Sequence, residues 1–381
     1  MREFDVVVFG ATGFTGRFVA EALAAAAAPV RWAIAGRDPE RLAALRRELV
    51  DAHGAAAGVP VVVARSDDPA SLRAMVCRTK VVASTVGPFE QHGDPLVDAC
   101  VEHGCDYVDS TGEPAFWRRT VSRLHAAAVE RQVLLVPCCG FDSVPHDLGA
   151  LLTARALEGE RGLEIDAFVR ATGDPSGGTW ASLLEALAGM GRPEPGAGPT
   201  SPRGRTRTPM RPHFEPAVGQ WVVPLPTVDP LVVRRSAQFC PELGPELRYR
   251  HWLQTRTLGK TAALLGGVAA LTVLAKIGPT RRWLLARKPQ GQGPSAEVRA
   301  RSKFEVVFIG RAASGRSVRV RVAGRDPGYG FTGATVAAAA LVLACDRERL
   351  RYRGGVLTPA SGLGDPFIER LRGRWLEIDV A

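Results

Sequence analysis

The chain has 381 residues, of which 46% are hydrophobic and 23% are charged. A single hydrophobic core stops growing at roughly 250–300 residues, so the length predicts two domains, and the composition excludes a disordered protein and a polytopic membrane protein. The formal charge of +10 does not indicate a nucleic-acid partner, because the arginines are spread over all segments, and a basic patch facing a membrane stays open as its explanation.

The cysteines and the N-terminus indicate a reducing compartment. The seven cysteines are odd in number and include no Cys-x-x-Cys pair, so we expect neither a disulfide framework nor a zinc site, and no metal is predicted. Residues 1–5 lead directly into an apolar segment and leave no room for a signal peptide. We therefore expect a cytoplasmic protein.

Alternating strand and helix signals fill the first third of the chain. Strands are expected at 6–9, 30–35, 59–64, 81–85, 107–109 and 133–136, with helices at 17–28, 39–53, 69–78, 95–103 and 116–131. Asp38 before Pro39 is typical of a helix start. The alternation predicts an α/β fold, with a doubly wound parallel Rossmann sheet in residues 1–140.

The pattern changes after Pro137, and we expect a second domain in residues 141–325. A helix is predicted at 180–188, an exposed loop at 191–216 and a pair of strands within 304–322. Residues 326–381 form a third segment, in which an alanine-rich helix at 333–345 is expected to pack back on the first domain.

Residues 261–275 form a run of fifteen residues without a charge, between Lys260 and Lys276. As a helix this run would be about 22 Å long, shorter than the roughly 30 Å hydrocarbon core of a bilayer. We therefore do not expect it to cross a membrane in one span. A buried or interface helix is one interpretation, and a helix under an acyl chain or on a membrane surface is the other.

Residues 10–16 form a Gly-x-x-Gly-x-x-Gly loop between the first expected strand and the first expected helix. Gly10 permits a tight turn, Gly13 lets the backbone approach a pyrophosphate, and Gly16 permits close packing of the helix. The diphosphate of a dinucleotide would then lie on the helix N-terminus. The predicted phosphate-binding residues are Gly10, Thr12, Gly13, Phe14, Thr15 and Gly16.

Residues after the second and fourth strands indicate which dinucleotide binds. Arg37 stands where NAD-binding folds place an acid on the ribose, and an arginine there suits the 2′-phosphate of NADP. Thr85 and Gly87 follow the fourth strand, at the edge where the nicotinamide half passes. NADPH is therefore the predicted cofactor. A surface role for Arg37 and a simple turn at Gly87 are the alternatives.

Catalytic residues are harder to assign from the sequence. None of the four tyrosines is followed by lysine four residues later, so the proton-donating pair of short-chain dehydrogenases is absent. His146 is the best-placed candidate for a general acid. The sequence favours a structural role for His146 and a helix-capping role for Asp142 or Ser143, so the catalytic residues stay unassigned.

Several motifs together resemble the saccharopine dehydrogenase-like oxidoreductases, and within them the bacterial trans-acting enoyl reductases of mycobacterial and actinobacterial type. The motifs span the chain and lie at 10–16, 35–37, 85–89 with Gly93, 98–100, 107–113, 140–145, 177–179, 232–236, 326–330 and 355–360. The family often carries an acid just after the third strand, near adenine, where this chain has Arg65. Asp67 is the residue that would take its place.

The resemblance implies a Rossmann domain followed by an α+β domain with a mixed sheet. It also implies NADPH-dependent reduction of an enoyl group on a lipid or polyketide chain, carried by a synthase or an acyl carrier protein, as in phenolic glycolipid and phthiocerol lipid synthesis. The expected reaction is hydride transfer to the β-carbon of an unsaturated thioester and protonation of the α-carbon, with the thioester carbonyl polarised by the protein.

Two other functions stay open at this stage. An imine reductase of the saccharopine-forming kind needs arginines for several carboxylates, and Arg234 and Arg235 could supply them. A non-catalytic NADP(H)-binding protein at a membrane surface is the third interpretation, since no proton donor is identified. A homodimer and a peripheral place on the inner face of the plasma membrane, through 261–275, are also expected as options.

Overall fold

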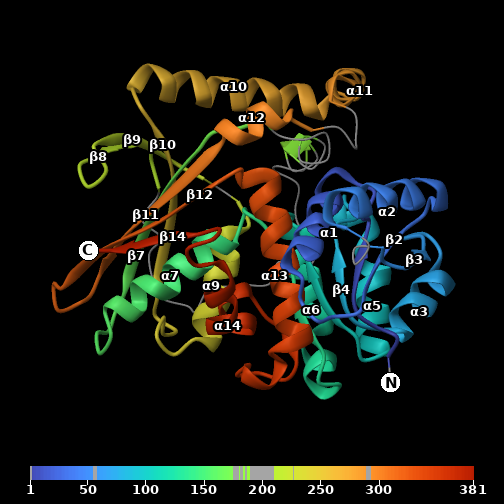
Figure 1. The fold of residues 1–381 in the computed structure, drawn as a ribbon. Helices are drawn as coiled ribbons and strands as arrows, with labels where there is room; N and C mark the ends of the chain where they lie inside the picture. The colour runs from blue at the N-terminus through green and yellow to red at the C-terminus, as the bar shows by residue number, and fades with distance from the viewer. Residues whose placement is uncertain are drawn as a thin grey trace.

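The computed structural model describes residues 2–54, 58–174, 180, 183–184, 187–188, 210–225, 227–288 and 293–381. Two seven-stranded sheets, A and B, stand side by side, and the long helix α13 (Thr332–Cys345) lies between them (Figure 1). The N-terminal part of the chain forms most of sheet A, and sheet B follows it in the sequence.

Sheet A is parallel throughout, in the order β13-β6-β5-β4-β1-β2-β3, which confirms the predicted Rossmann sheet. Its strands are β1 (Phe4–Phe9), β2 (Trp32–Gly36), β3 (Val61–Val63), β4 (Thr79–Ser84), β5 (Asp106–Asp109), β6 (Leu134–Val136) and β13 (Gly355–Val356). Its helices are α1 (Phe14–Ala26), α2 (Pro39–His53), α3 (Pro69–Cys77), α4 (Phe89–His92), α5 (Asp94–Glu102) and α6 (Pro114–Glu130).

The side chains of β1 are apolar on both sides of the strand, and helices cover both faces of sheet A. Val6 and Val8 belong to the hydrophobic cluster shared with α1, α2 and α13, whereas Val7 and Phe9 belong to the cluster shared with α3, α5 and α6. A strand that is buried on both faces reads as a continuous apolar run, as in other parallel sheets. The predicted start of α2 is confirmed, since the Asp38 carboxylate accepts from the N–H of Glu40 at 3.0 Å.

Sheet B is mixed, in the order β14-β12-β11-β7-β10-β9-β8, and only β7 and β10 run parallel. Its strands are β7 (Glu164–Ala171), β8 (His213–Glu215), β9 (Gln220–Pro224), β10 (Arg248–Thr255), β11 (Lys303–Arg311), β12 (Ser317–Arg325) and β14 (Glu377–Val380). The helices α7 (Val144–Ala156), α9 (Asp229–Phe239), α10 (Leu258–Lys276), α11 (Gly278–Arg287), α12 (Ala296–Arg301) and α14 (Gly364–Leu371) accompany it. The paired strands expected within 304–322 are β11 and β12.

The last part of the chain belongs to both sheets. Helix α13 packs against α1 and β4, β13 pairs with β6 of sheet A, and β14 pairs with β12 of sheet B. Short helical turns, η2 (Pro327–Phe331), η3 (Arg347–Arg349) and η4 (Pro359–Leu363), connect these elements. The C-terminal segment therefore holds the two halves together as well as packing on the first.

Two expectations for the second domain fall partly outside the described residues. The loop expected at 191–216 can be examined only from 210 onward, where it is wrong, because His213–Glu215 form β8. That strand is three residues long, follows Pro212, precedes Pro216 and pairs only with β9, so its periodicity is too short to recognise. A helix is expected at 180–188, and the residues of this range that the structure describes are all helical.

The apolar run at 261–275 differs from expectation in length and in burial. Helix α10 has 19 residues, so it is about 28 Å long, and the shorter length inferred from the sequence is wrong. Only Thr261 and Ala275 are buried, so it is not a buried helix. Two helical segments in the described part of the chain, Leu258–Lys276 and Pro327–Cys345, are long and apolar enough to span a membrane.

Candidate active site

A cavity of about 890 Å³ lies along the carboxyl edge of sheet A and reaches the second half of the chain. One wall comes from the loop after β1 and from the ends of β2, β3 and β4. The rest of the lining comes from later parts of the chain, including 140–142, 171–174 and 326–332. This is the edge at which open α/β sheets bind their ligands, because strand carboxyl ends and helix N-termini converge there.

Two glycines shape the loop after β1. Gly10 has φ +85°, and a Cβ there would stand 2.7 Å from Cγ2 of Val86. A Cβ on Gly16 would stand 2.2 Å from the Gly10 carbonyl oxygen, so only glycine lets α1 approach the loop this closely. Gly16 is buried and acts by packing, whereas Gly10 and Gly13 lie on the cavity wall.

The N-terminus of α1 faces the cavity with backbone N–H groups that no side chain in the described part of the chain caps. Gly13 occupies the N-cap position without a side-chain hydrogen bond, and the first turn contains no acidic residue. Thr12 and Thr15 stand beside it on the wall. Partial positive charge and free N–H donors at a helix N-terminus are suited to a diphosphate.

Phe14 forms the side of the loop nearest the C-terminal segment. Its ring meets Phe18 at 5.4 Å and Tyr329 of η2 at 4.8 Å between centroids, both edge to face. Tyr329 also lines the cavity. The phosphate loop is therefore braced by a residue that lies more than 300 positions away in sequence, which the sequence could not indicate.

Two arginines converge where the 2′-phosphate of NADP would lie. Arg37 follows β2 and is exposed on the cavity wall. Arg41, one turn into α2, lines the same wall and donates to the backbone oxygen of Thr12 at 3.3 Å. Sequence reasoning identified Arg37 and missed Arg41, although Arg37 stands just before the N-cap of α2 and Arg41 lies in its first turn.

The adenine side of the cavity carries an ion pair. Arg65 donates to both carboxylate oxygens of Asp67, at 3.1 and 2.9 Å, and both residues line the wall. The hydrogen bond from Arg65 lowers the pKa of Asp67 below its ordinary value, so the carboxylate is charged. Asp67 therefore lies on the cavity wall, paired with the arginine that occupies the usual position of the acid, and its contact with adenine stays a prediction.

Residues after β4 form the part of the wall where the nicotinamide half is expected. Thr85 and Gly87 both line the cavity. The Thr85 hydroxyl donates to the carbonyl oxygen of Gly10 at 3.2 Å, so it ties the end of β4 to the glycine loop. Its role in this structure is to hold the loop in place.

Asp142 and Glu113 are carboxyl groups on the wall near this region, and sequence reasoning did not identify Asp142 as such. Glu113 accepts from the backbone N–H groups of Phe89 and Glu90, at 3.1 and 2.7 Å. Asp142 follows β6, is exposed to the cavity, and its Oδ2 would lie 2.6 Å from a Cβ on Gly112. Surrounding protein raises the pKa of Asp142 above its ordinary value by desolvation. The expected capping role is wrong, because Ser143 is the N-cap of α7 and neither side chain caps it.

A buried carboxyl group fixes the two loops that carry Gly112 and Asp142. Asp109, at the end of β5, accepts from the backbone N–H of Thr111 at 2.9 Å and of Cys138 at 2.8 Å. The Tyr107 hydroxyl donates to its other oxygen at 2.8 Å. Burial raises the pKa of Asp109 to about 7, against the lowering effect of these donors. Asp109 is a positioning residue for this wall.

His146 lies behind the wall, in a buried cluster with Asp229 and His251. Its Nδ1 is 3.3 Å from Oδ1 of Asp229, and Nδ1 of His251 is 3.4 Å from Oδ2 of the same carboxyl group. Thr227, which lines the cavity, donates to Asp229. Burial lowers the pKa of His251 to about 3 and raises that of Asp229 well above its ordinary value, so burial disfavours the charged form of both groups.

The same cluster contains residue types that bind metals. One ligand atom from each of His146, Asp229 and His251 lies within 4.8 Å of the others, and all three residues are buried. The expected absence of a metal stays a prediction, and elemental analysis of the purified protein tests it. His146 stays a candidate for a catalytic role, and its connection to the cavity runs through Asp229 and Thr227.

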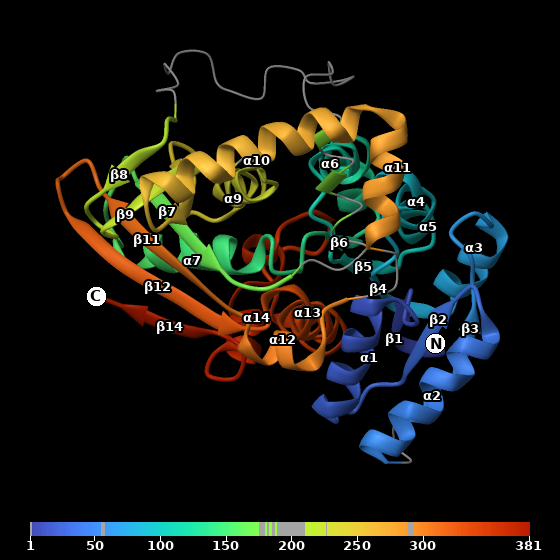
Figure 2. The same cartoon turned by 90° about the horizontal axis from the view of Figure 1, so that it is seen from above.

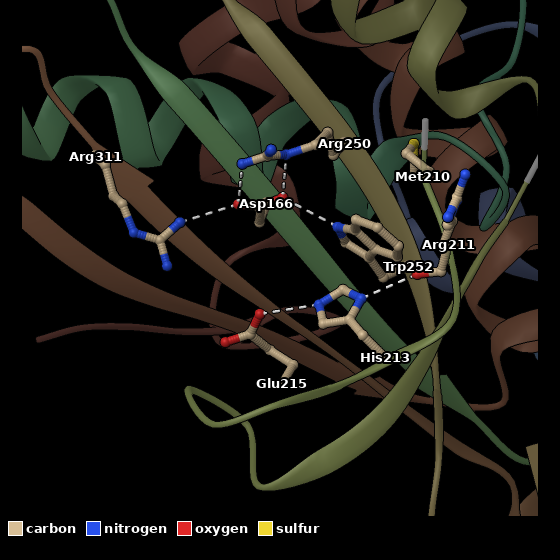
Figure 3. A pocket seen from close by; sticks show the side chains of 8 residues that line it. All are labelled: Asp166, Met210, Arg211, His213, Glu215, Arg250, Trp252 and Arg311. Carbon is tan, nitrogen blue, oxygen red and sulfur yellow. Dashed lines mark hydrogen bonds and ion pairs between the residues drawn. The ribbon is translucent and has the colours of Figure 1, made fainter. Parts of the chain in front are cut away.

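A second hollow of about 380 Å³ lies on sheet B, away from the phosphate loop (Figure 3). Asp166 of β7 stands at its centre and accepts from Arg250 at 2.6 and 2.8 Å and from Arg311 at 3.0 Å. His213 and Glu215, both on β8, approach each other at 3.3 Å and also line the hollow. Its charges are largely balanced within the sheet, and we assign it no ligand.

Sequence comparison agrees with this geometry. Residues 6–136 match the model of the saccharopine dehydrogenase NADP-binding domain. A trans-acting enoyl reductase from Mycobacterium tuberculosis is 33% identical, over 98% of this chain and 96% of the relative. Rv2449c of the same species, named for the same activity, is 37% identical over 97% and 96%. The chain belongs to the saccharopine dehydrogenase-like family, in its trans-acting enoyl reductase branch.

The fold of the family extends to solved structures. The apo saccharopine dehydrogenase (L-Glu forming) from Saccharomyces cerevisiae superposes with a TM-score of 0.57 over 99% of each chain, at 15% identity. The likeness at this identity concerns the fold, and it covers both sheets. This member of the trans-acting enoyl reductase branch is an NAD(P)-dependent oxidoreductase, and its cofactor is NADPH.

Proposed function

We propose that this protein reduces the double bond of an α,β-unsaturated acyl thioester with NADPH, on a lipid or polyketide chain that a synthase or an acyl carrier protein presents. The observation that carries the proposal is the lining that the chain after β6 contributes to the cavity. It combines small or apolar residues with the carboxyl group of Asp142 near the expected nicotinamide region, and its other charged residues are Asp174, Arg299 and Asp326. The small or apolar residues are Ala171, Thr172, Gly173, Leu183, Val228, Pro294 and Pro327.

Bound NADPH supplies the hydride that reduces the β-carbon of the substrate. The protein then has to provide a proton for the α-carbon. Asp142 is placed for this step, because it lies on the cavity wall beside the expected nicotinamide region and its raised pKa keeps it protonated to higher pH. Proton release from Asp142 leaves a carboxylate that solvent in the cavity can reprotonate.

The imine-reductase alternative has less support at this site. Arg234 donates to the carbonyl oxygen of Pro230 at 2.7 Å, and Arg235 donates to His125 at 2.9 Å. Neither arginine is among the cavity-lining residues. In the described lining that the chain after β6 contributes, the arginine is Arg299, which is paired with Asp326. A substrate with several carboxylates would find few positive charges there.

The decisive experiment follows NADPH oxidation by the purified protein with two substrate classes. One class is enoyl thioesters of increasing chain length, on coenzyme A and on an acyl carrier protein, and the other is the imine of lysine and 2-oxoglutarate. Oxidation with enoyl thioesters, and a saturated acyl product by mass spectrometry, would support the proposal. Turnover of the imine alone would establish the alternative, and tight NADPH binding without any turnover would favour a binding protein.

A further inference from the structure

Helix α10 exposes an apolar surface that a soluble protein does not leave in water. It runs along the upper edge of the molecule in Figure 1, and Figure 2 shows it crossing the same face from above. Leu265, Val268 and Val273 are 45%, 42% and 60% exposed. Ile277 and Trp283, at the junction and on α11, are 47% and 52% exposed. Contiguous exposed apolar area of this kind marks a site that something covers.

The charge around this surface has one sign. The sequence has no acidic residue between 247 and 296, and the segment 258–288 is apolar in its middle and basic at its ends. Its basic residues are Lys260, Lys276, Arg281, Arg282, Arg287 and Lys288. The guanidinium of Arg287 stacks on the exposed Trp283 ring at 4.1 Å. Basic residues and tryptophan beside an apolar helix are typical of elements at the surface of an anionic bilayer.

The connections of α10 show that it cannot cross the bilayer, although its length of about 28 Å would allow it. The preceding strand β10 and the following strand β11 both pair with β7, so the chain leaves and re-enters the same sheet. The intervening helices α11 and α12 have 10 and 6 residues and are too short to return across the hydrocarbon core. Helix α10 can therefore lie only along a surface.

The C-terminal end of α10 is covered by the protein. Ala275 and the α11 residue Leu284 form a hydrophobic cluster with Leu184 and Leu187. Trp180 anchors this contact by donating from Nε1 to the Leu284 carbonyl oxygen at 2.9 Å. Leu183, between these residues, lines the cavity. The exposed apolar surface and the active-site cavity are thus connected by one short segment.

We propose that α10 and α11 dock this protein on the surface of an anionic lipid bilayer, with α10 in the plane of the membrane at the boundary of headgroups and acyl chains. A second copy of the chain is a poorer occupant, because pairing this surface with itself would bring two acid-free basic segments together. The proposal does not depend on the reaction catalysed. It also places the cavity next to the membrane.

The test is flotation of the full-length protein with lipid vesicles. We expect binding to vesicles of phosphatidylcholine mixed with phosphatidylglycerol, and weak binding to phosphatidylcholine alone. The variant Leu265→Glu/Val268→Glu/Val273→Glu should lose the binding, since it places carboxylates on the docking face. The control Val63→Glu/Val129→Glu/Val380→Glu changes residues of similar exposure (52%, 50% and 53%) elsewhere and should bind like the parent.

The electrostatic part is tested by Lys260→Gln and Lys276→Gln. Each change should weaken binding to the anionic vesicles about fivefold, with little effect on binding to neutral ones. Circular dichroism and NADPH binding verify that each variant is folded.

Three results would overturn the proposal. The first is that the folded parent binds neither kind of vesicle. The second is that the triple α10 variant binds the anionic vesicles as well as the parent does. The third is a parent dimer that becomes monomeric in the α10 variant by light scattering, because the surface would then be a contact between copies.

Discussion

Two helical segments of this protein have nearly the same length and composition and opposite surroundings. Leu258–Lys276 and Pro327–Cys345 both have 19 residues, with mean hydropathies of 1.7 and 1.6, yet 11% of the first window and 78% of the second are buried. The second, which contains α13, packs on α1 and β4, and the first, α10, lies on the edge of the molecule (Figure 1). Apolar composition alone therefore does not indicate whether the protein itself covers a helix.

The same substitution, alanine to glutamate, should change the stability of the protein very differently in the two helices. Ala340→Glu places a charge at a fully buried position of α13 and should destabilise the protein by more than about 4 kcal/mol, since the carboxylate has no partner there. Ala270→Glu in α10 is exposed and should change the stability by less than about 0.5 kcal/mol. Urea denaturation measures both. Comparable losses in the two variants would mean that α10 is covered within the folded monomer.

The next largest effect concerns catalysis beside α13, where Asp142→Asn removes the proposed proton donor. Turnover of an enoyl thioester should fall by about 10²–10⁴-fold, with NADPH affinity unchanged. Desolvation by the surrounding protein raises the pKa of Asp142, so the parent should be active below that pKa and lose activity as the pH rises through it. The remaining activity of the variant should lack this decline. Asp174→Asn, also on the cavity wall, serves as the matched control, and equal losses in both variants would exclude a specific role for Asp142.

A smaller effect is expected at the phosphate end of the same cavity. Arg37→Ala and Arg41→Ala should each weaken NADPH binding about tenfold to a hundredfold and leave NADH binding nearly unchanged, because a charge-assisted contact to the 2′-phosphate is lost. Fluorescence titration measures both cofactors. Arg46→Ala, exposed on α2 and absent from the cavity wall, should have no effect. A parallel loss of NADH binding would indicate that the arginines support the fold of the loop.

The smallest effect links the cavity to α10. Leu183→Ala removes the apolar side chain that lines the cavity beside the α10 contact, so kcat/KM should fall about tenfold for long acyl thioesters and much less for short ones. Steady-state kinetics over a chain-length series shows the split. Leu258→Ala, exposed at the start of α10, is the control. The same loss at every chain length would mean that the acyl chain does not pass Leu183.

The sequence by itself determined the elements whose signals are local. The strand expected at 6–9, the glycine loop at 10–16 and the helix expected at 17–28 follow from apolar runs and glycine spacing, and the structure has the strand at 4–9 and the helix at 14–26. Arg37 followed from its place after the second strand. Asp67 and Thr85 were also placed on the cavity wall by their positions after strands. Parallel strands bring their carboxyl ends to one edge, so order along the chain sufficed to assemble this side of the site.

Only the tertiary structure decided the features that depend on distant partners. The Asp142 side chain faces Gly112 and so lies on the cavity wall. The His146 side chain lies behind that wall, in a buried cluster with Asp229 and His251. The exposure of α10 likewise depends on distant partners, since the pairing of both β10 and β11 with β7 keeps the helix on one side of the sheet. Periodicity within a segment specifies which face is apolar, whereas contacts between segments decide whether that face is buried.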